Sequence, residues 1–243
     1  MRQVGRTNAE FNLIEEGDRV LVGLSGGKDS LTMIHAMNEH KKRTPFNFEF
    51  IAVTVSYGMG EEFETLQNHC KEHNIEHKIY DTKIYEVAQD KIRKNSSYCS
   101  FFSRMRRGSL YSAANLYNCN KVALGHHLDD AVESYFMNLI YNGQMRSLAP
   151  KYRADNGLVV IRPLIQLRER QLRAFTDENS ISTIGDEMCP SMRFDTKAPH
   201  ARASMKAMLA GMEEQYPDIF TSINAAFKNI STDTFFDKDK FNV

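Results

Sequence analysis

Short apolar runs alternate with amphipathic stretches along most of the chain. Four of these runs have the length of a strand, at about residues 20–24, 48–55, 75–80 and 121–125. Their nearly continuous apolar character is typical of strands that are buried on both faces of a sheet. Between them we expect helices that begin at about Leu31 and that cover about 61–73, 83–95, 103–117 and 129–141. Strands and helices that alternate in this way predict an α/β fold with a doubly wound parallel sheet.

The two ends of the chain differ from this central pattern. Apolar residues recur at helical spacing before the first strand. The sequence beyond Pro150 predicts one more strand at 158–161, a helix at about 167–179 and two closing helices. We therefore expect three parts: an N-terminal helix or arm at 1–17, the α/β domain at 18–165, and a small, mainly helical C-terminal extension at 166–243 that packs on the same domain.

The composition limits the partners that the chain can bind. Its 243 residues include 31 Lys and Arg and 31 Asp and Glu, so a polyanion must be bound by a local basic patch. No apolar run approaches the roughly 18 residues of a membrane-spanning helix, and the N-terminal segment lacks the apolar core of a signal peptide. We therefore expect a cytoplasmic protein without a membrane partner. The 4 cysteines are widely separated, which favours reduced thiols over disulfides.

The first strand runs directly into the segment Ser25-Gly26-Gly27-Lys28-Asp29-Ser30. Two adjacent glycines let the backbone turn tightly and direct several N–H groups into one concavity, to which the following helix adds its partly positive N-terminus. Lys28 supplies a mobile positive charge, and the hydroxyl groups of Ser25 and Ser30 can bind phosphate oxygens. The spacing matches neither the Walker A motif nor the Gly-x-Gly-x-x-Gly fingerprint. An ordinary turn would not need these residues together, so we predict a phosphate-binding loop.

A second loop of unusual composition, Gly125-His126-His127-Leu128-Asp129-Asp130, follows the strand at 121–125. Gly125 permits close approach of the backbone, and either Asp129 or Asp130 could cap the next helix or bind Mg²⁺. For this loop taken alone, a helix cap with solvated neighbours is the alternative. Because the carboxyl ends of parallel strands share one edge of the sheet, we expect this loop and the phosphate loop to lie on the same edge.

A thiol lies beside three arginines in the segment 98–111. Guanidinium groups and a helix N-terminus would favour the thiolate of Cys99, which makes Cys99 a candidate nucleophile, sulfur carrier or metal ligand. An ordinary buried cysteine beside a solvated basic turn is the alternative, and the arginines could instead bind RNA phosphates or a triphosphate. Cys189 lies in an irregular polar segment where packing does not explain it, whereas Cys70 and Cys119 have apolar neighbours.

Together these segments resemble one known family. The loop 25–30 is similar to the pyrophosphate loop of the N-type ATP pyrophosphatases, and the segment 123–130 is shared across that superfamily. The segment 99–111 resembles the tRNA 2-thiocytidine synthetase family, and the whole resemblance covers about residues 5–230. It implies a fold of the adenine nucleotide alpha hydrolase-like type. The implied activity is adenylation of the C2 oxygen of a cytidine in the tRNA anticodon region, with ATP and Mg²⁺, before sulfur displaces AMP.

This activity gives each candidate residue an expected role. Ser25, Gly26, Gly27, Lys28 and Ser30 would hold the pyrophosphate, and Lys28 would offset the charge that develops on it. Asp29 and Asp130, or Asp129 instead of Asp130, would position Mg²⁺. Val53 would touch the adenine through its backbone, and Gly125 and His126 would complete the nucleotide site. We expect no general base, because the C2 oxygen carries no proton to remove. The residues expected to take part in catalysis are Lys28, Asp29, Cys99 and Asp130.

The family is implied to carry an iron–sulfur cluster on three cysteines, and this chain departs from that pattern. Phe102 stands where the resemblance implies the second cysteine, so only Cys99 and Cys189 remain as ligands. A cluster held by two thiolates needs further ligands that iron rarely takes. The sequence therefore favours a protein without the cluster. Cys99 would then carry persulfide sulfur itself, or the enzyme would modify a different substrate.

The implied partners are tRNA and a sulfur-donor protein or small sulfide source, and a homodimer is a further expectation. Two alternatives stay open: a ligase of the lysidine synthetase type, which couples an amine to the adenylated base, and an ATP- or AMP-binding module without turnover. Basic residues of the C-terminal half, such as Arg168 and Arg202, could bind RNA. A surface of ordinary salt bridges would explain them equally well.

Overall fold

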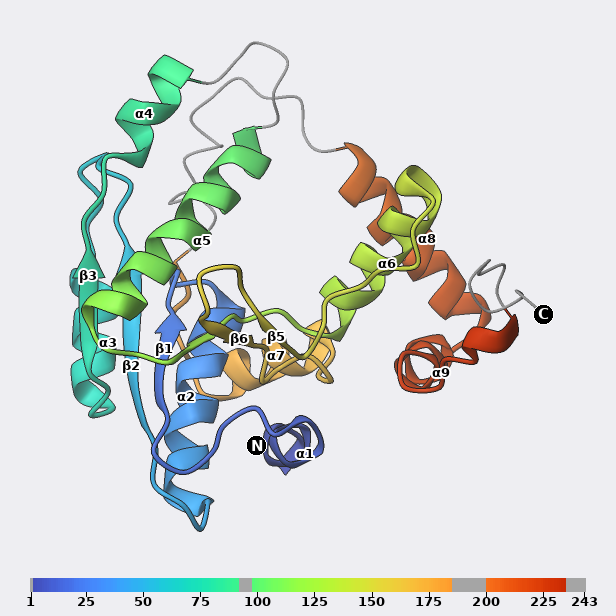
Figure 1. Ribbon diagram of the computed structural model, residues 1–243, viewed down its shortest axis with the longest axis horizontal. Helices are drawn as coiled ribbons and strands as arrows, with labels where there is room; N and C mark the ends of the chain where they lie inside the picture. Colours follow the sequence, from blue (N-terminus) through green and yellow to red (C-terminus); the bar gives the residue numbers. More distant parts are fainter. Residues whose placement is uncertain (1, 92–97, 185–199, 235–243) are drawn as a thin grey trace.

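A six-stranded sheet in the order β3-β2-β1-β4-β6-β5 forms the centre of the protein (Figure 1). The computed structural model describes residues 2–91, 98–184 and 200–234. The strands are β1 (Arg19–Gly23), β2 (Glu49–Val55), β3 (His77–Tyr80), β4 (Lys121–Ala123), β5 (Lys151–Arg153) and β6 (Val159–Ile161). All neighbouring strands are parallel except β5, which pairs antiparallel with β6. The mostly parallel sheet confirms the predicted fold class.

Helices follow most of the strands, as the alternation predicted. They are α1 (Arg2–Phe11), α2 (Lys28–Arg43), α3 (Glu64–Glu72), α4 (Ile84–Lys91), α5 (Tyr98–Leu116), α6 (Leu128–Asn142), α7 (Glu169–Glu178), α8 (His200–Gln215) and α9 (Ile219–Ala226), with a short 3₁₀ turn at Thr232–Thr234. Within the described ranges, none of these helices is long and apolar enough to cross a bilayer.

Apolar side chains alternate between the two faces of the sheet and build a core on each. Val20 and Val22 of β1 face a cluster that includes residues of α1, α2, α3 and α7. Leu21, the residue between them, faces the opposite cluster, which includes residues of α4 and α5. Because both faces are covered, all three residues are fully buried. This two-sided burial explains why the strand is apolar without alternation.

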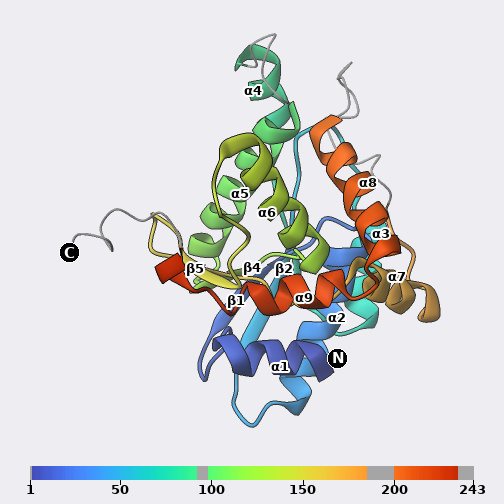
Figure 2. The same ribbon diagram turned by 90° about the vertical axis from the view of Figure 1, so that its right-hand side faces the viewer.

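A third apolar cluster lies away from the sheet. Leu128 and Val132 of α6 pack there with Met205 and Leu209 of α8 and Phe220 of α9. Figure 2 shows these three helices beside the sheet layers. The C-terminal extension therefore packs in two places. Its helices α8 and α9 pack on α6, and Leu172 of α7 belongs to the core that also includes residues of α2. The domain limits expected at residues 17 and 165 stay a prediction.

A buried lysine joins the start of β4 to the segment before β1. Lys121 is 4% exposed, and its Nζ lies 2.6 Å from Asp18 Oδ2 and donates to the carbonyl of Leu13. The carboxylate of Asp18 also accepts from the side chain of Asn120. A lysine removed from water in this way needs such partners. The contacts hold the start of β4 beside the start of β1, and the candidate site lies at the opposite, carboxyl ends of these two strands.

The sequence did not predict β5. Its three residues, Lys-Tyr-Arg, contain no apolar run, and they form a strand only because β6 offers an unpaired edge. Tertiary pairing of this kind overrides local sequence preference.

Candidate functional site

Two loops meet where the sheet changes direction. The chain leaves β1 toward β2 on one side, whereas β4 lies on the other side, with Val22 level with Ala123. Open α/β sheets bind their ligands in the crevice at such a switch point. A Cβ atom on Gly125 would lie 3.4 Å from the carbonyl carbon of Asp29, so the two backbones nearly touch. The phosphate loop and the loop 125–130 therefore lie on one edge, as predicted.

The phosphate loop leaves the N-terminus of α2 open. Gly26 has φ +84°, a conformation that favours glycine, and Gly27 is the N-cap of α2 without a side-chain hydrogen bond. The hydroxyl of Ser30 donates to the carbonyl of Gly27 at 3.0 Å and accepts from the backbone N–H of Ser25 at 3.2 Å. These contacts brace the loop, while the first amides of a 16-residue helix remain free for an anion.

A cavity of about 310 Å³ lies in front of this helix end. Its wall combines the phosphate loop with backbone of β2 at Val53–Val55, the loop residues Gly125 and His126, and Ile184. Arg106 and Leu110 of α5 close it from another side. The cavity thus brings together the predicted residues Ser25, Gly27, Asp29, Ser30, Val53, Gly125 and His126. Its apolar and cationic walls suit a ligand with a flat ring and a charged tail.

His126 presents a neutral imidazole to this cavity. Burial lowers the pKa of His126 to about 4, and the nearby charge of Arg162 acts in the same direction. The Nε of Arg162 donates to His126 Nδ1 at 3.1 Å. The proton of the neutral ring is therefore on Nε2, which leaves this nitrogen as a hydrogen-bond donor.

Asp29 and Asp130 lie on either side of one buried histidine. His127 Nε2 is 3.9 Å from Asp29 Oδ1 and 3.4 Å from Asp130 Oδ2. Burial opposes protonation of His127, but the carboxylates of Asp129, Asp130 and Asp29 outweigh it and raise its pKa. The Nδ1 of His127 accepts from the backbone N–H of Asp130 and caps α6. The structure therefore brings together the two carboxylates that the sequence predicted as ligands of Mg²⁺.

The donor set fits such a cation. Asp29 Oδ1 is buried and accepts no hydrogen bond, although the charged Nζ of Lys28 lies 3.2 Å away. A buried carboxylate oxygen without a hydrogen bond is costly unless a cation or water satisfies it. Hard oxygen ligands from one or two carboxylates are what Mg²⁺ takes beside substrate phosphates. Asp29 and Asp130 could hold the ion there.

Asp129 points instead toward α7. Its carboxylate accepts from the backbone N–H of Glu169 at 2.6 Å and from Arg168 Nε at 3.1 Å. Burial opposes ionisation of Asp129, but His127, Glu169 N–H and Arg168 outweigh it and lower the pKa to about 2. Arg168 also forms a bidentate pair with Glu213 of α8. These contacts make Asp129 a link between α6, α7 and α8, and its predicted role in nucleotide binding stays a prediction.

Lys28 is held by a carboxylate that the sequence did not point to. Its Nζ lies 3.0 Å from Glu169 Oε1, and Glu169 also accepts from Lys206 of α8 at 2.8 Å. Burial works against ionisation of both partners, yet Asp29 and Glu169 raise the pKa of Lys28. Lys206 and Lys28 lower the pKa of Glu169 to about 2 despite its burial. The lysine is therefore charged and positioned beside the phosphate loop.

The cysteine predictions are only partly covered by the described residues. Cys99 is part of α5, but its side chain lies outside the described residues, and so does Cys189. Phe102 is 3% exposed and packs edge-to-face with Tyr57, with ring centroids 6.1 Å apart. Cys70 and Cys119 are buried free thiols, and burial raises the pKa of Cys70 to about 11. Phe102 is a core residue that cannot bind iron, and because the side chains of Cys99 and Cys189 lie outside the described residues, a protein without the cluster stays a prediction.

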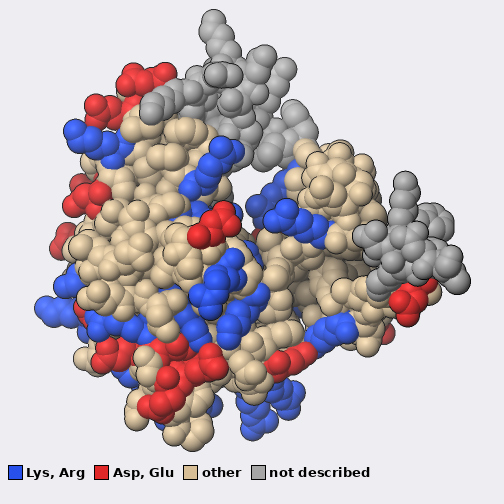
Figure 3. Space-filling model, viewed as in Figure 1, with Lys and Arg blue, Asp and Glu red and all other residues tan. Residues whose placement is uncertain are grey.

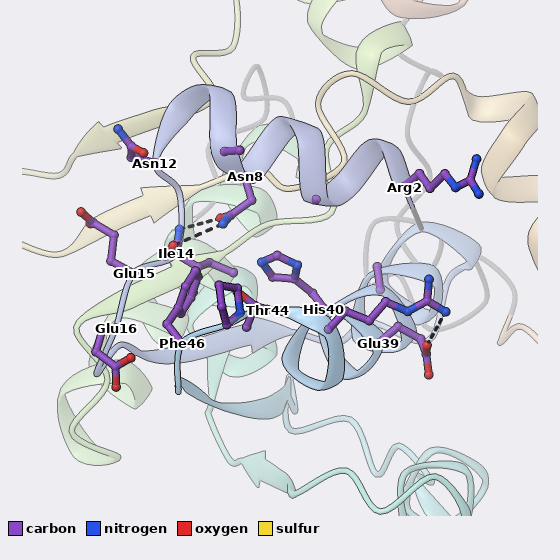
Figure 4. Close-up of a pocket in the computed structure, with 15 residues that line it drawn as sticks. Arg2, Asn8, Asn12, Ile14, Glu15, Glu16, Glu39, His40, Thr44 and Phe46 are labelled. Carbon is purple, nitrogen blue, oxygen red and sulfur yellow. Dashed lines mark hydrogen bonds and ion pairs between the residues drawn. The ribbon is translucent and has the colours of Figure 1, made fainter.

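A larger cavity of about 630 Å³ lies at the opposite edge of the sheet (Figure 4). It is bordered by α1, the end of α2 and the segment around Phe46. Some of its polar groups already have partners, since Asn8 binds the backbone of Ile14 and Arg43 pairs with Glu39, whereas the buried Nε2 of His40 makes no hydrogen bond with the described residues. The predicted residues lie at the other, carboxyl edge, so the smaller cavity is the candidate site.

Sequence reasoning missed three parts of the site. Glu169 and Ile184 lie far from the two motifs in the chain, and only the fold brings them to the phosphate loop. The backbone N–H of Ile184 donates to the carbonyl of Gly26 at 2.9 Å. The pairing of Arg162 with His126 also has no local signal. The sequence left open whether the arginines at 104–107 bind RNA phosphates or a triphosphate, and Arg106 does border the cavity.

Comparisons with known proteins agree with this geometry. A family model described as "PP-loop domain" matches residues 2–198. The chain is 39% identical over 238 residues to a protein of Geobacter metallireducens named tRNA-cytidine(32) 2-sulfurtransferase, covering 97% of this chain and 91% of that protein. A protein of the same name from Pseudomonas syringae pv. syringae is 37% identical, with 99% and 86% covered.

Solved structures show the same fold. The U34-tRNA thiolase NcsA of Methanococcus maripaludis, solved with its [4Fe-4S] cluster, superposes with a TM-score of 0.76 at 25% identity. The match covers 97% of this chain and 81% of that one. The NH3-dependent NAD synthetase of Campylobacter jejuni, in complex with the nitrate ion, reaches a TM-score of 0.50 at 18% identity, covering 94% and 89%. This second match shows the fold alone.

The contact between Gly26 and Ile184 can be tested by adding one methyl group. A Cβ at Gly26 would lie 3.0 Å from Ile184 Cβ, whereas a Cβ at Gly60 would meet nothing within 4 Å, although φ is positive at both (+84° and +75°). We expect Gly60→Ala to lower the free energy of unfolding by about 1–2 kcal/mol, from backbone strain alone. Gly26→Ala should lose about 1–3 kcal/mol more, from overpacking. Equal losses in urea unfolding would show that Ile184 does not rest on the loop.

The Asp129 contacts predict a pH-dependent stability. The folded-state pKa of Asp129, about 2, lies below the ordinary value of 3.8, so its contribution is complete above about pH 4 and is lost as the pH falls toward 2. We expect Asp129→Asn to lower the free energy of unfolding by about 2 kcal/mol near pH 7, and by less near pH 3. Urea unfolding across this range checks it, with exposed Asp155→Asn as control. A deficit that stays constant with pH would contradict the assignment.

Proposed function

Because this chain belongs to the PP-loop domain family and to its tRNA-cytidine 2-sulfurtransferase branch, we propose that it is an ATP-dependent tRNA thiolase. It would activate a cytidine of the anticodon region at C2 and replace the oxygen with sulfur. The observation that carries the proposal is the open N-terminus of α2, which shares one cavity with His126 and with Asp29. Position 32, which the names of the relatives specify, is the proposed target.

The cavity gives ATP a defined direction. The adenine would lie against the backbone of Val53–Val55, and the triphosphate would extend toward the amides of Gly27 and Lys28. Lys28, fixed by Glu169, would offset the charge that develops on the departing pyrophosphate. Asp29 and Asp130 would hold Mg²⁺, which when bound supplies further positive charge to the phosphates.

The first step needs positioning more than proton transfer. The C2 oxygen of cytidine attacks the α-phosphorus of ATP, pyrophosphate leaves, and the base becomes an adenylate. The oxygen carries no proton, so no residue has to act as a base. The Nε2–H of neutral His126 is a donor that would stabilise negative charge on the α-phosphate.

The second step brings sulfur to C2, and AMP leaves with the original oxygen. A small sulfide source would supply it as hydrosulfide, or the thiolate of Cys99 would take the outer sulfur of a persulfide on a donor protein, which leaves as its thiolate. In the second case the terminal sulfur bonds to C2, and a second thiol breaks the S–S bond by forming a disulfide with Cys99. The proposed sulfur transfer does not use an iron–sulfur cluster. Phe102, a core residue that cannot bind iron, stands where the resemblance implies the second cysteine.

The tRNA itself would approach along α5. Arg104, Arg106 and Arg107 are exposed on this helix, and Arg106 also borders the cavity. Figure 3 shows Lys and Arg side chains on both sides of a hollow in the surface. Arg168 and Arg202 of the C-terminal half are less available, because both are bound to carboxylates. Exposed guanidinium groups are the usual ligands of RNA phosphates.

Two alternatives are less well supported. The named relatives are sulfurtransferases, and the solved match at a TM-score of 0.76 is a thiolase, which favours sulfur over an amine as the second reactant. A module without turnover would not need two carboxylates and a charged lysine around the phosphate position. The proposed location is the cytoplasm, because the proposed substrate is a tRNA. The homodimer expected from the sequence stays a prediction.

Replacing Lys28 tests the adenylation step. Lys28→Met should lower tRNA-dependent pyrophosphate release by roughly 10²–10³-fold, because it removes charge from the leaving group. Lys206→Met is the matched control, since Lys206 is the other lysine bound to Glu169 yet its side chain is 62% exposed. We expect Lys206→Met to stay within about threefold of the parent rate. Equal losses would mean that the network around Glu169 matters and not the charge beside the phosphates. An inactive parent enzyme that still binds ATP would favour the module.

Replacing Cys99 tests the sulfur step separately. Cys99→Ser should abolish thionucleoside formation, measured by mass spectrometry of tRNA digests, while pyrophosphate release continues. The reason is that the adenylate forms without the thiol. The control is Cys119→Ser, because Cys119 is a buried packing residue. Full thiolation by Cys99→Ser would remove Cys99 from the mechanism.

A further inference from the structure

Three histidines from two helices converge outside the nucleotide cavity. His35 is in the middle of α2, whereas His69 and His73 lie four residues apart at the end of α3. The Nε2 atoms of His35 and His69 are 2.9 Å apart. The three rings form a triangle, with centroid separations of 5.0, 4.5 and 4.7 Å. One nitrogen of each ring lies within 4.8 Å of the others.

This spacing is close to that of a metal site with three imidazole ligands. A tetrahedral ion with metal–nitrogen bonds of about 2.0–2.1 Å holds its ligand atoms roughly 3.3 Å apart. The distances between the histidine nitrogens run from 2.9 Å to at most 4.8 Å, so they lie on both sides of that value. Rotation of the exposed ring of His73, at the C-terminus of its helix, would bring them to it.

Two of the rings, those of His35 and His69, favour the neutral form that binds a metal ion. Burial, followed by the neighbouring imidazoles, lowers the pKa of His35 to about 4. Burial and His73 lower the pKa of His69 in the same direction. A neutral imidazole has one ring nitrogen with a free lone pair, and in the single N–H···N contact between His35 and His69 only one of the two rings uses it.

A cavity of about 540 Å³ opens onto the histidines. It is bounded by α2, α3 and the end of α7, with Phe175 against the ring of His35 at 5.8 Å. Three protein ligands with one open side leave a coordination position for water or for the exposed Glu72, which also borders this cavity. Imidazole favours zinc, copper, nickel and cobalt over Mg²⁺, so this site and the carboxylates near the phosphate loop would take different ions.

We propose that His35, His69 and His73 bind a divalent transition metal ion, with Zn²⁺ as the test ion. The ion would tie α3 to α2, the helix whose N-terminus carries the phosphate loop. The proposal does not depend on the thiolation chemistry, because it rests on a separate set of side chains. The alternative is a cluster of packed aromatic rings without a ligand.

The test uses the full chain after removal of metals with a chelator. Titration with Zn²⁺ by calorimetry should show a single binding site with a dissociation constant of about 1 μM or lower. Saturating Zn²⁺ should raise the unfolding temperature by several degrees. His73→Gln, at an exposed position, should weaken binding by roughly 10²-fold, as should His69→Gln. Asn68→Ala, in the same cavity wall, should leave the affinity unchanged.

Cobalt distinguishes this site from cysteine ligation. Co²⁺ should give the visible absorption of a tetrahedral nitrogen site, without a thiolate charge-transfer band. This absorption and the binding of Zn²⁺ should both persist in a Cys99→Ser, Cys189→Ser double variant. Absence of Zn²⁺ binding at micromolar concentration would overturn the proposal. Binding that survives both histidine changes, or that disappears with the two cysteines, would overturn it as well.

Discussion

The close approach of two backbones at the centre of the sheet is the constraint on which the site depends. Gly125 lies against Asp29 and Ser30, so the loop after β4 can reach the loop after β1 without a side chain between them. The parallel pairing of β1 with β4 puts both strand ends level, and the switch in strand order opens the crevice above them. Asp29, His126 and the open end of α2 then face one cavity.

Electrostatic contacts from the C-terminal half hold these groups in place. Glu169 of α7 binds Lys28, and Arg168 next to it binds Asp129. Arg202 of α8 reaches both Asp130, at 2.5 Å, and Glu133. Each carboxylate around the cavity therefore has a cationic neighbour, which keeps buried negative charges tolerable before any ligand binds. The helical extension thus completes the site through side chains that do not line the cavity.

The sequence predicted the local parts of this site well and the distant parts poorly. The loops 25–30 and 125–130 carry their chemistry in consecutive residues, and the buried strands before them are recognisable from apolar runs. Glu169, Arg162 and Ile184 act on the same cavity through contacts between segments far apart in the chain. Such contacts leave no local pattern. The strand β5 was missed for the same reason, because only its pairing with β6 makes it a strand.

The basic residues of the C-terminal half illustrate how the fold decides between two interpretations. Their sequence fits an RNA-binding surface and a salt-bridged surface equally well. Arg168 is bound by Asp129 and Glu213 and lies over the ring of Phe220 at 3.4 Å, so it holds helices together. A guanidinium group committed in this way would lose charged partners in order to bind a phosphate. The exposed arginines of α5 lose no such partner contact that the described residues show, and this difference in cost places the proposed RNA contact on α5.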